Sequence, residues 1–359
     1  MEQGIIYRSS GSLFNYIGWP TVAKDENGVI YAVCSGHRLG HICPFGMNYM
    51  FKSYDGGKSF DGPIIVNDTP FDDRDAGILP LGNNKLLLSW FINDSNVYTS
   101  RYSRITNYTA PENAELWKNG VERWKQIPEE EVLFGSYIRL SENGGKSWSE
   151  PINVPVTSPH GPAKLKDGRL LYLGTIFGNA ESNTNLISKI AAYESLDDGY
   201  SWNFLGTVPN IENVFEICEP YQLELDNNTI LGVIRVHGER DSSKFSTYKT
   251  FSYDGGKSWS NPELVCKGAP PHLLLHSSGA IVMTYTIRDE KFGQRARISR
   301  DGGKSFSEEI VLCENARNWD SGYCSSIELD DGSIYTVYYQ KAEGDNYCSL
   351  MYTKWNLPK

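Results

Sequence analysis

The sequence predicts an all-β protein, a six-bladed β-propeller whose blades are four-stranded antiparallel sheets. Aromatic residues make up 13% of the 359 residues and occur together with 34 glycines, a composition typical of many short strands joined by tight turns. One eight-residue motif occurs five times, and a turn followed by a strand of alternating apolar residues occurs six times. Self-similarity at roughly 50 residues is the repeat length of a propeller blade.

The eight-residue motif, called the box below, reads Ser-x-Asp-x-Gly-x-Ser-Trp with small variations. Its copies are SYDGGKSF, SENGGKSW, SLDDGYSW, SYDGGKSW and SRDGGKSF, beginning at Ser53, Ser141, Ser195, Ser252 and Ser299. The Asp-Gly-Gly core provides a tight turn with residues that tolerate positive φ, and the last aromatic residue packs between neighbouring sheets. We therefore interpret the box aspartates as folding devices at outer turns, not as ligands or catalytic acids.

Six predicted hairpins accompany the five boxes. They span residues 25–33, 81–90, 165–173, 225–234, 276–285 and 329–339. The sixth unit keeps a strand at 349–356 without the box turn, and residues 5–10 are predicted to add a strand to this last blade and close the ring. Closure would remove the exposed edges of the sheets. We expect one domain over residues 1–359.

The long spacing in the second unit contains an insertion at about 103–133. Its Pro-Glu-Asn start and the spacing of its tryptophans predict one or two short amphipathic helices. The insertion is interpreted either as a lid or rim of the central site or as a surface decoration. Deleting 111–127 is expected to leave folding intact.

Charge and cysteine content exclude several classes of function. The net charge is −10 with no basic run, so no nucleic-acid partner is expected, and no segment has the roughly 20 apolar residues of a membrane span. The seven cysteines form no Cys-x-x-Cys pair, which argues against a disulfide framework and against a zinc site. We expect no metal, no cofactor and a cytoplasmic protein, or a secreted one if a signal peptide has been removed. The oligomeric state is not indicated.

Six blades with repeated boxes resemble the sialidase (neuraminidase) superfamily, also known for its bacterial neuraminidase repeat or Asp-box, over essentially the whole chain. Sialidases carry a Glu at the start of blade four and an Arg on the neighbouring strand, which Glu219 and Arg235 resemble. They also carry an Arg at the end of the blade-five inner strands and a Tyr at the start of blade six, which Arg288 and Tyr323 resemble.

The resemblance implies a retaining glycosidase with a tyrosine nucleophile. A substrate whose anomeric carbon bears a carboxylate repels an anionic nucleophile, so a neutral Tyr323, activated by Glu219, replaces the usual carboxylate. Arginine forks then bind the substrate carboxylate.

Blade one departs from the family pattern. The chain has Gly18-Trp19-Pro20 where the family has Arg-Ile-Pro, and no Asp follows in the stretch 35–47 where the family has its acid/base catalyst. Several residues are candidate replacements: His41 or His160 as acid/base, Asp73 or Asp75 from the start of blade two, and Arg38 or Arg74 as the substitute arginine.

The leading prediction is a sialidase-like exo-glycoside hydrolase that releases a terminal acidic sugar from a glycan. The alternatives are a lyase or histidine-dependent glycosidase acting on uronate-bearing polysaccharide, and a carbohydrate-binding propeller without catalysis. In all three the partner is a carbohydrate.

Overall fold

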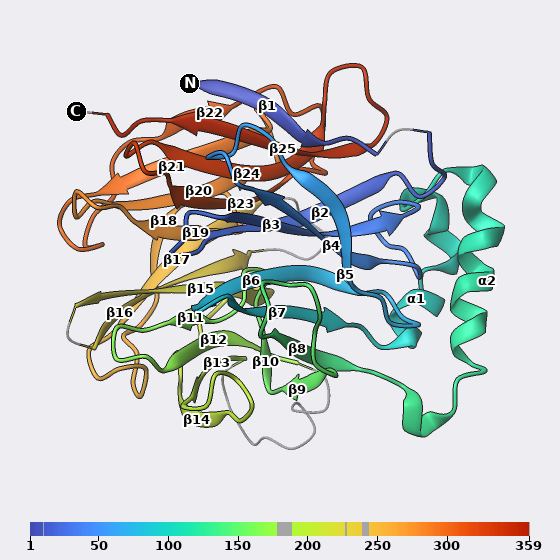
Figure 1. Ribbon diagram of the computed structural model, residues 1–359, viewed down its shortest axis with the longest axis horizontal. Coiled ribbons are helices and arrows are strands. Elements are labelled where there is room, and N and C mark those ends of the chain that lie inside the picture. Colours follow the sequence, from blue (N-terminus) through green and yellow to red (C-terminus); the bar gives the residue numbers. More distant parts are fainter. Residues whose placement is uncertain (10, 178–188, 227, 239–243, 359) are drawn as a thin grey trace.

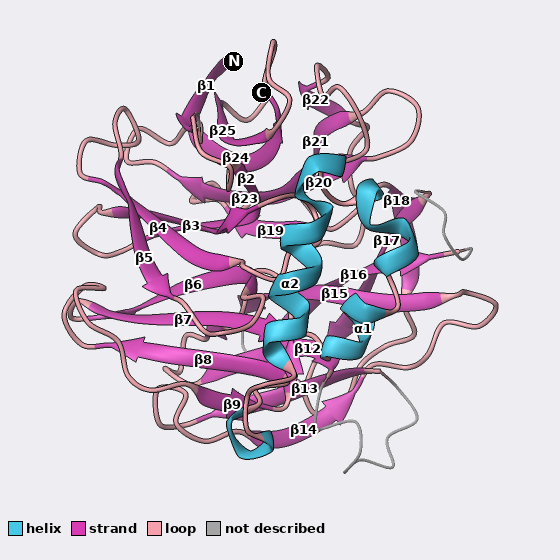
Figure 2. Cartoon of the chain, turned by 90° about the vertical axis from the view of Figure 1, so that its right-hand side faces the viewer, coloured by secondary structure: helices cyan, strands magenta, loops and turns pink. Residues whose placement is uncertain are grey.

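Six antiparallel sheets are arranged as blades around one axis (Figure 2). The computed structural model describes residues 1–9, 11–177, 189–226, 228–238 and 244–358. Five sheets have four strands, and the third has five because its inner strand is split in two. The predicted six-bladed propeller of antiparallel sheets is confirmed.

Within a blade the strands run in chain order from the axis outward. Blade one contains β2 (Tyr16–Lys24), β3 (Ile30–Arg38), β4 (Met47–Ser53) and β5 (Asp61–Asn67). Blade two contains β6 (Arg74–Gly82), β7 (Lys85–Ile92), β8 (Gly135–Ser141) and β9 (Ile152–Val154). Blade three contains β10 (Val156–Thr157), β11 (Ala163–Lys164), β12 (Leu170–Ile176), β13 (Ile190–Ser195) and β14 (Asn203–Thr207).

The second half of the ring follows the same order. Blade four contains β15 (Glu216–Asp226), β16 (Thr229–His237), β17 (Phe245–Ser252) and β18 (Glu263–Lys267). Blade five contains β19 (His272–Leu275), β20 (Ile281–Ile287), β21 (Gly293–Ser299) and β22 (Ile310–Cys313). Blade six contains β23 (Gly322–Glu328), β24 (Ile334–Lys341), β25 (Cys348–Trp355) and, outermost, β1 (Glu2–Tyr7). All six predicted hairpins join the first two strands of a blade; Asn227, within the fourth, lies outside the described residues.

The N-terminal strand closes the ring. β1 pairs antiparallel with β25, with Glu2 opposite Lys354 and Ile5 opposite Met351. The two chain ends consequently lie close together (Figure 1). The strand predicted at 5–10 is thus confirmed, although it begins earlier, at Glu2, and Ser10 lies outside the described residues.

The second strand of each blade is buried along most of its length because neighbouring blades cover both of its faces. In β12 the four residues from Leu170 to Leu173 are at most 1% exposed. The core therefore consists of layers between adjacent blades, and the box aromatics belong to these layers: Trp259 is 8% exposed and packs in the layer between blades three and four.

The box turns join the third and fourth strands of blades one to five, and their side-chain hydrogen bonds are local. In the fourth box, Asp254 Oδ1 accepts hydrogen bonds from the Ser252 hydroxyl at 2.9 Å and from the Ser258 N–H at 2.9 Å. The Ser258 hydroxyl donates to Asp254 Oδ2 at 2.5 Å. Burial acts to raise the pKa of Asp254, but these hydrogen bonds together outweigh it and lower the pKa to about 2. The carboxylate therefore stays charged, with its hydrogen-bond partners in its own turn.

The insertion between β7 and β8 is helical and covers one face of the ring. Its helices are α1 (Ser95–Thr99), η1 (Tyr102–Asn107), η2 (Pro111–Asn113), α2 (Ala114–Trp124) and η3 (Glu129–Glu131). Figure 1 shows α2 beside the blades, and in Figure 2 it crosses in front of the ring. The predicted helical insertion is present, and its helices begin earlier than expected, at Ser95.

Helix α2 is anchored by its tryptophans. Trp117 is fully buried, and its Nε1 donates to the Ile42 carbonyl at 2.7 Å; Trp124 Nε1 donates to the Pro70 carbonyl at 2.8 Å. These bonds attach the helix to the β3–β4 and β5–β6 loops. Deleting 111–127 would remove side chains from the core of blades one and two, so the structure argues against the expectation that this deletion leaves folding intact.

A search of the helices within the described residues finds none with the length and apolar content needed to cross a bilayer.

Candidate active site

A cavity of about 370 Å³ lies where the inner strands of the blades begin, a size within the usual range for small-molecule sites. Every blade contributes to its wall, so the cavity lies on the axis. The contributing residues include, in blade order, Trp19, Asp75, Ser158, Glu219, Arg288 and Tyr323. Asn93 and Arg101 from the insertion complete the wall, so the insertion forms part of the rim, as one of its two interpretations predicts.

Four inner strands carry the same backbone irregularity at the cavity. Trp19, Asp75, Glu219 and Tyr323 have positive φ values of 55°, 50°, 48° and 54°. The strand registers shift between Gly18 and Thr21, Arg74 and Gly77, Cys218 and Tyr221, and Gly322 and Ser325. Such bulges re-aim side chains, and non-glycine residues with positive φ are strained. All four side chains line the cavity.

Two of these bulge residues, Glu219 and Tyr323, are joined by a short hydrogen bond in the cavity. The Tyr323 hydroxyl donates to Glu219 Oε1 at 2.6 Å, and Arg235 donates to Glu219 Oε2 at 2.6 Å. Arg235 also lies 3.2 Å from the Tyr323 hydroxyl oxygen. The predicted group of Glu219, Arg235 and Tyr323 is therefore brought together as one network.

The protonation states follow from this arrangement. Burial and the charge of Glu219 raise the pKa of Tyr323 well above its usual value. Burial alone would raise the pKa of Glu219, but the charge of Arg235 and the hydrogen bonds from Tyr323 and Arg235 outweigh it and lower that pKa. At neutral pH a neutral phenol thus faces a carboxylate that can accept its proton.

Asp75 is a second carboxyl group on the cavity wall with the opposite behaviour. It is 5% exposed, and its Oδ1 has no hydrogen-bond partner in the described part of the chain; the nearest cation, Arg74 Nε, is 3.9 Å away. Burial and the negative charge of Glu219 raise the pKa of Asp75 to about 7, although Arg74 opposes the shift. Asp75 can therefore hold or release a proton near neutrality.

Three arginines of the cavity wall come from blades two, four and five: Arg74, Arg235 and Arg288. Arg74 stacks on the Trp19 ring at 4.1 Å, and Arg288 Nε donates to the Ser321 carbonyl at 2.8 Å. Within the described residues, the Nε atoms of Arg74 and Arg235 have no hydrogen-bond partner. The wall thus offers guanidinium donors held in place by packing, a suitable surface for a carboxylate.

His41 lies on the wall beside a buried carboxylate. Its Nδ1 is 2.9 Å from Asp320 Oδ1, which also accepts hydrogen bonds from Tyr16 at 2.7 Å and Tyr339 at 3.1 Å. Burial lowers the pKa of His41 despite Asp320. The Trp19 ring packs edge-on against the imidazole at 5.1 Å. Asp320 therefore orients His41 in the way a general base is oriented.

Arg38 and Asp73, both predicted at the site, do not line this cavity. Arg38 is fully buried and forms an ion pair with Asp72, donating to its Oδ2 at 3.0 Å. Asp73 accepts hydrogen bonds at 2.8 Å from the backbone N–H and the hydroxyl of Thr69, and burial raises its pKa to about 7. Both side chains bind neighbouring residues of the protein, so the structure gives no support to Arg38 as the substitute arginine or to Asp73 as the replacement residue from blade two.

His160 is also outside the cavity wall. Its Nδ1 lies 3.0 Å from the Thr21 hydroxyl, and its ring packs against Tyr221 and His272 with centroids 5.7 and 4.9 Å away. Burial lowers its pKa to about 3, so the imidazole is neutral and fills the channel between inner strands. The contacts that the structure shows for His160 are packing contacts, and the acid/base role expected from the sequence stays a prediction.

Sequence reasoning missed Asp320 and the role of Trp19. Asp320 directly precedes the start of blade six in Asp-Ser-Gly-Tyr-Cys, and that neighbourhood was the available signal. Trp19 stands at the bulge of blade one, where the family pattern led us to look for a cation. It instead holds Arg74 from blade two by stacking, a contact between blades that no local pattern encodes.

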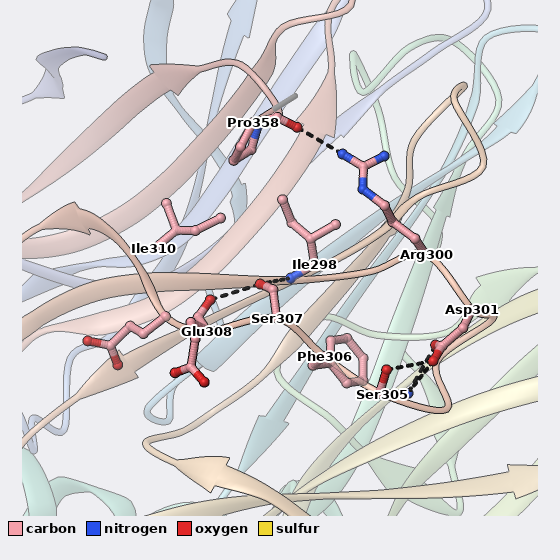
Figure 3. Close-up of a pocket in the computed structure, with 10 residues that line it drawn as sticks. Ile298, Arg300, Asp301, Ser305, Phe306, Ser307, Glu308, Ile310 and Pro358 are labelled. Atoms are coloured by element: carbon pink, nitrogen blue, oxygen red, sulfur yellow. Dashed lines mark hydrogen bonds between the residues drawn. The ribbon is translucent and has the colours of Figure 1, made fainter.

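A larger hollow of about 570 Å³ lies at the periphery, beside the fifth box. Figure 3 shows its side chains, where Asp301 accepts hydrogen bonds from Ser305 of its own turn and Arg300 donates to the Pro358 carbonyl at 2.8 Å. Asp301 also accepts a hydrogen bond from the Ser299 hydroxyl of the same turn at 2.8 Å. No two titratable side chains are hydrogen-bonded to each other there among the residues drawn. The axial cavity remains the better candidate site.

Fold and site together define a propeller with a charged axial cavity. The family model described as a BNR repeat-like domain matches residues 117–336, and the chain belongs to this family. A comparison with curated proteins finds no match.

Solved structures share the whole fold at low sequence identity. A protein of unknown function from Dyadobacter fermentans is 22% identical with a TM-score of 0.78, over 100% of this chain and 98% of that one. The NanB sialidase of Streptococcus pneumoniae is 14% identical with a TM-score of 0.69, over 99% of this chain and 70% of that one. An α-L-arabinanase of Penicillium chrysogenum is 14% identical with a TM-score of 0.60, over 98% of each chain.

Proposed function

We propose that the chain is a sialidase-like exo-glycoside hydrolase that releases a terminal acidic sugar with retention of configuration. The observation that carries the proposal is the 2.6 Å hydrogen bond from Tyr323 to Glu219 in a cavity on the propeller axis. The similarity in fold to the NanB sialidase agrees with it. The similarity to an arabinanase leaves the general class, a glycosidase, as the broader expectation.

In the first step the Tyr323 oxygen attacks the anomeric carbon while its proton passes to Glu219. Asp75, whose raised pKa of about 7 leaves part of it protonated at neutral pH, donates its proton to the departing glycosidic oxygen. A glycosyl–tyrosine intermediate and a free alcohol result. A neutral phenol suits this attack because it approaches a carbon bearing a carboxylate without charge repulsion.

In the second step the roles of Asp75 and Glu219 reverse. The Asp75 carboxylate removes a proton from water, and the water oxygen attacks the anomeric carbon. The Tyr323 oxygen leaves and regains its proton from Glu219. Both residues return to their starting states, so two inversions give net retention.

The arginines of the cavity serve the substrate carboxylate. Arg235 and Arg288 both lie beside Tyr323: Arg235 is 3.2 Å from its hydroxyl, and the Arg288 guanidinium lies 5.2 Å from its ring centroid. Arg74 approaches from blade two. A carboxylate bound by these groups places the anomeric carbon against the Tyr323 hydroxyl.

The test is hydrolysis of a 4-methylumbelliferyl α-sialoside, with the product anomer followed by NMR. We expect release of the α-anomer by the natural chain and none by Tyr323→Phe. Tyr253→Phe, which changes an exposed tyrosine of a box turn, is the matched control and should keep full activity. Equal activity of Tyr323→Phe and the natural chain would refute the nucleophile.

A second candidate rests on the His41–Asp320 pair. An imidazole oriented by a buried carboxylate at 2.9 Å could abstract a proton from a uronate sugar, as in a lyase, while the arginines neutralise the uronate. Incubation with uronate-bearing polysaccharides distinguishes it, because a lyase product gains an ultraviolet-absorbing C=C bond. Such absorbance that is lost in His41→Gln would replace the sialidase proposal.

A further inference from the structure

A thiol, an imidazole and a carboxylate converge on the wall of the axial cavity contributed by blade four. Cys218 Sγ lies 3.7 Å from His237 Nε2, which lies 3.8 Å from Glu216 Oε2. Within the described residues they are the one group of three or more His, Cys, Asp or Glu side chains whose ligand atoms all lie within 4.8 Å of one another. The proposed hydrolysis uses none of them.

The pairing of two adjacent strands creates this cluster. In the β15–β16 ladder Glu216 is opposite His237, and Cys218 is opposite Arg235. Glu216 and Cys218 are two residues apart on one strand, so their side chains share a face. The ligands are therefore fixed by a regular ladder and not by a loop.

The spacing is close to what a tetrahedral ion requires. With Zn–S and Zn–N bonds of about 2.3 and 2.0 Å, sulfur and nitrogen ligands of one zinc ion lie roughly 3.5 Å apart. The observed 3.7 Å between Cys218 and His237 needs an adjustment of a few tenths of an ångström. The Glu216 side chain is 44% exposed and can rotate to close the remaining distances.

The charged groups near the cluster have both signs, and Arg235 and Arg288 place positive charge near His237. The groups that act electrostatically on the Cys218 thiol are Glu219, Arg235, Glu216 and Lys189. Two are negative and two positive, so they nearly balance. When a metal replaces the thiol proton, which is released to solvent, the thiolate adds a negative charge at the ion.

We propose that Glu216, Cys218 and His237 form a binding site for a zinc-like divalent cation on the cavity wall. Thiolate and imidazole ligands select zinc and its analogues over magnesium or calcium. Three protein ligands leave a fourth position open. Because the three residues line the cavity and Cys218 precedes Glu219, a bound ion occupies the cavity next to the Tyr323–Glu219 pair.

The direct test is titration of the metal-free chain with Co²⁺, read as absorbance. A stoichiometric thiolate-to-cobalt charge-transfer band and the strong visible bands of tetrahedral cobalt are expected, and Zn²⁺ should displace them. Cys218→Ser should lose the charge-transfer band, and His237→Gln and Glu216→Gln should weaken binding at least tenfold. Cys266→Ser changes a buried thiol of β18 in the same blade and should leave the titration unchanged.

Two outcomes would overturn the site. One is the absence of a saturable charge-transfer band in folded chain, with the fold verified by circular dichroism. The other is a band that survives Cys218→Ser or disappears in Cys266→Ser. None of these absorbance measurements depends on catalysis. The metal site can therefore be refuted while the hydrolase proposal stands, and the hydrolase proposal can be refuted while the metal site stands.

Discussion

The box turns at the periphery and the inner-strand bulges at the axis are both repeated devices, and they differ in what stays constant. In the boxes the residue types recur, and each box aspartate accepts hydrogen bonds from residues of its own turn, as Asp254 does from Ser252 and Ser258. At the axis the backbone recurs, with φ between 48° and 55°, while the residues are Trp, Asp, Glu and Tyr.

The comparison teaches how this fold separates stability from chemistry. Hydrogen bonds from its own turn lower the pKa of an exposed box aspartate, Asp254, to about 2, so its proton is never exchanged at neutral pH. Burial raises the pKa of the axial Asp75 to about 7. A constant residue in a satisfied turn builds the blade, whereas a variable residue on a strained bulge is available for a reaction.

The largest effect on catalysis is expected at Tyr323 and Glu219, where the bulges of blades six and four meet. Tyr323→Phe and Glu219→Gln should each lower kcat on the best acidic glycoside on the order of 10³-fold or more, and the double variant should be hardly worse. The reason is that the phenol needs the carboxylate to take its proton, so either loss removes the same step. Steady-state kinetics of the three variants measure this, and additive losses would show that the two residues act separately.

The raised pKa of the axial Asp75 should appear in the pH dependence of kcat/KM. Asp75 acts as an acid only while protonated, so kcat/KM should fall tenfold per pH unit above about 7. Glu219 must be ionised, and its lowered pKa places the acid limb below its ordinary value of 4.5.

Asp75→Asn should remove the alkaline limb and lower kcat/KM roughly 10²-fold on substrates with poor leaving groups. The loss should be small for an activated aryl glycoside, which needs no protonation. Asp330→Asn, at an exposed outer turn, is the control. An alkaline limb that persists in Asp75→Asn would assign the acid to another group.

A smaller effect on catalysis is expected at His41, which the sequence analysis named as one of several candidate acid/base residues. If Tyr323 is the nucleophile, His41→Gln and Asp320→Asn should change KM about tenfold with little change in kcat, because the imidazole then contacts substrate without moving a proton. Loss of kcat in both variants, with Tyr323→Phe still active, would favour the histidine-dependent reaction.

The sequence predicts the blades because their signals are local. Each box and each hairpin is a pattern of fewer than a dozen consecutive residues. The closing strand at Glu2–Tyr7 is expected because the last blade lacks a fourth strand of its own. The family pattern also placed Glu219 and Tyr323, which the structure joins by a hydrogen bond across 104 residues of sequence.

The remaining site residues depend on contacts between blades, which no local pattern records. Arg38 and Arg74 look equivalent in sequence, and both contact Asp72 and the Trp19 ring. Arg74 nevertheless lines the cavity, whereas Arg38 is fully buried away from it. The sequence spacing of Cys218 and His237 also matches no familiar metal motif. The register of the β15–β16 ladder, and not the length of a loop, brings the two side chains together.

The smallest effect is expected at the periphery, and it tests the comparison from the other side. Asp254→Ala removes the acceptor of the Ser252, Lys257 and Ser258 donors at an exposed turn where water can replace it in part. We expect a loss of roughly 1 kcal/mol in the free energy of unfolding, measured by denaturant titration, and unchanged kcat and KM. Ser260→Ala, which removes a hydroxyl just outside the same box, serves as the control for a change of this size. A loss of activity without a loss of stability would mean that the outer turn affects the axial cavity. The conclusion that the box turns only stabilise the blades while the axial residues carry out the reaction would then be wrong.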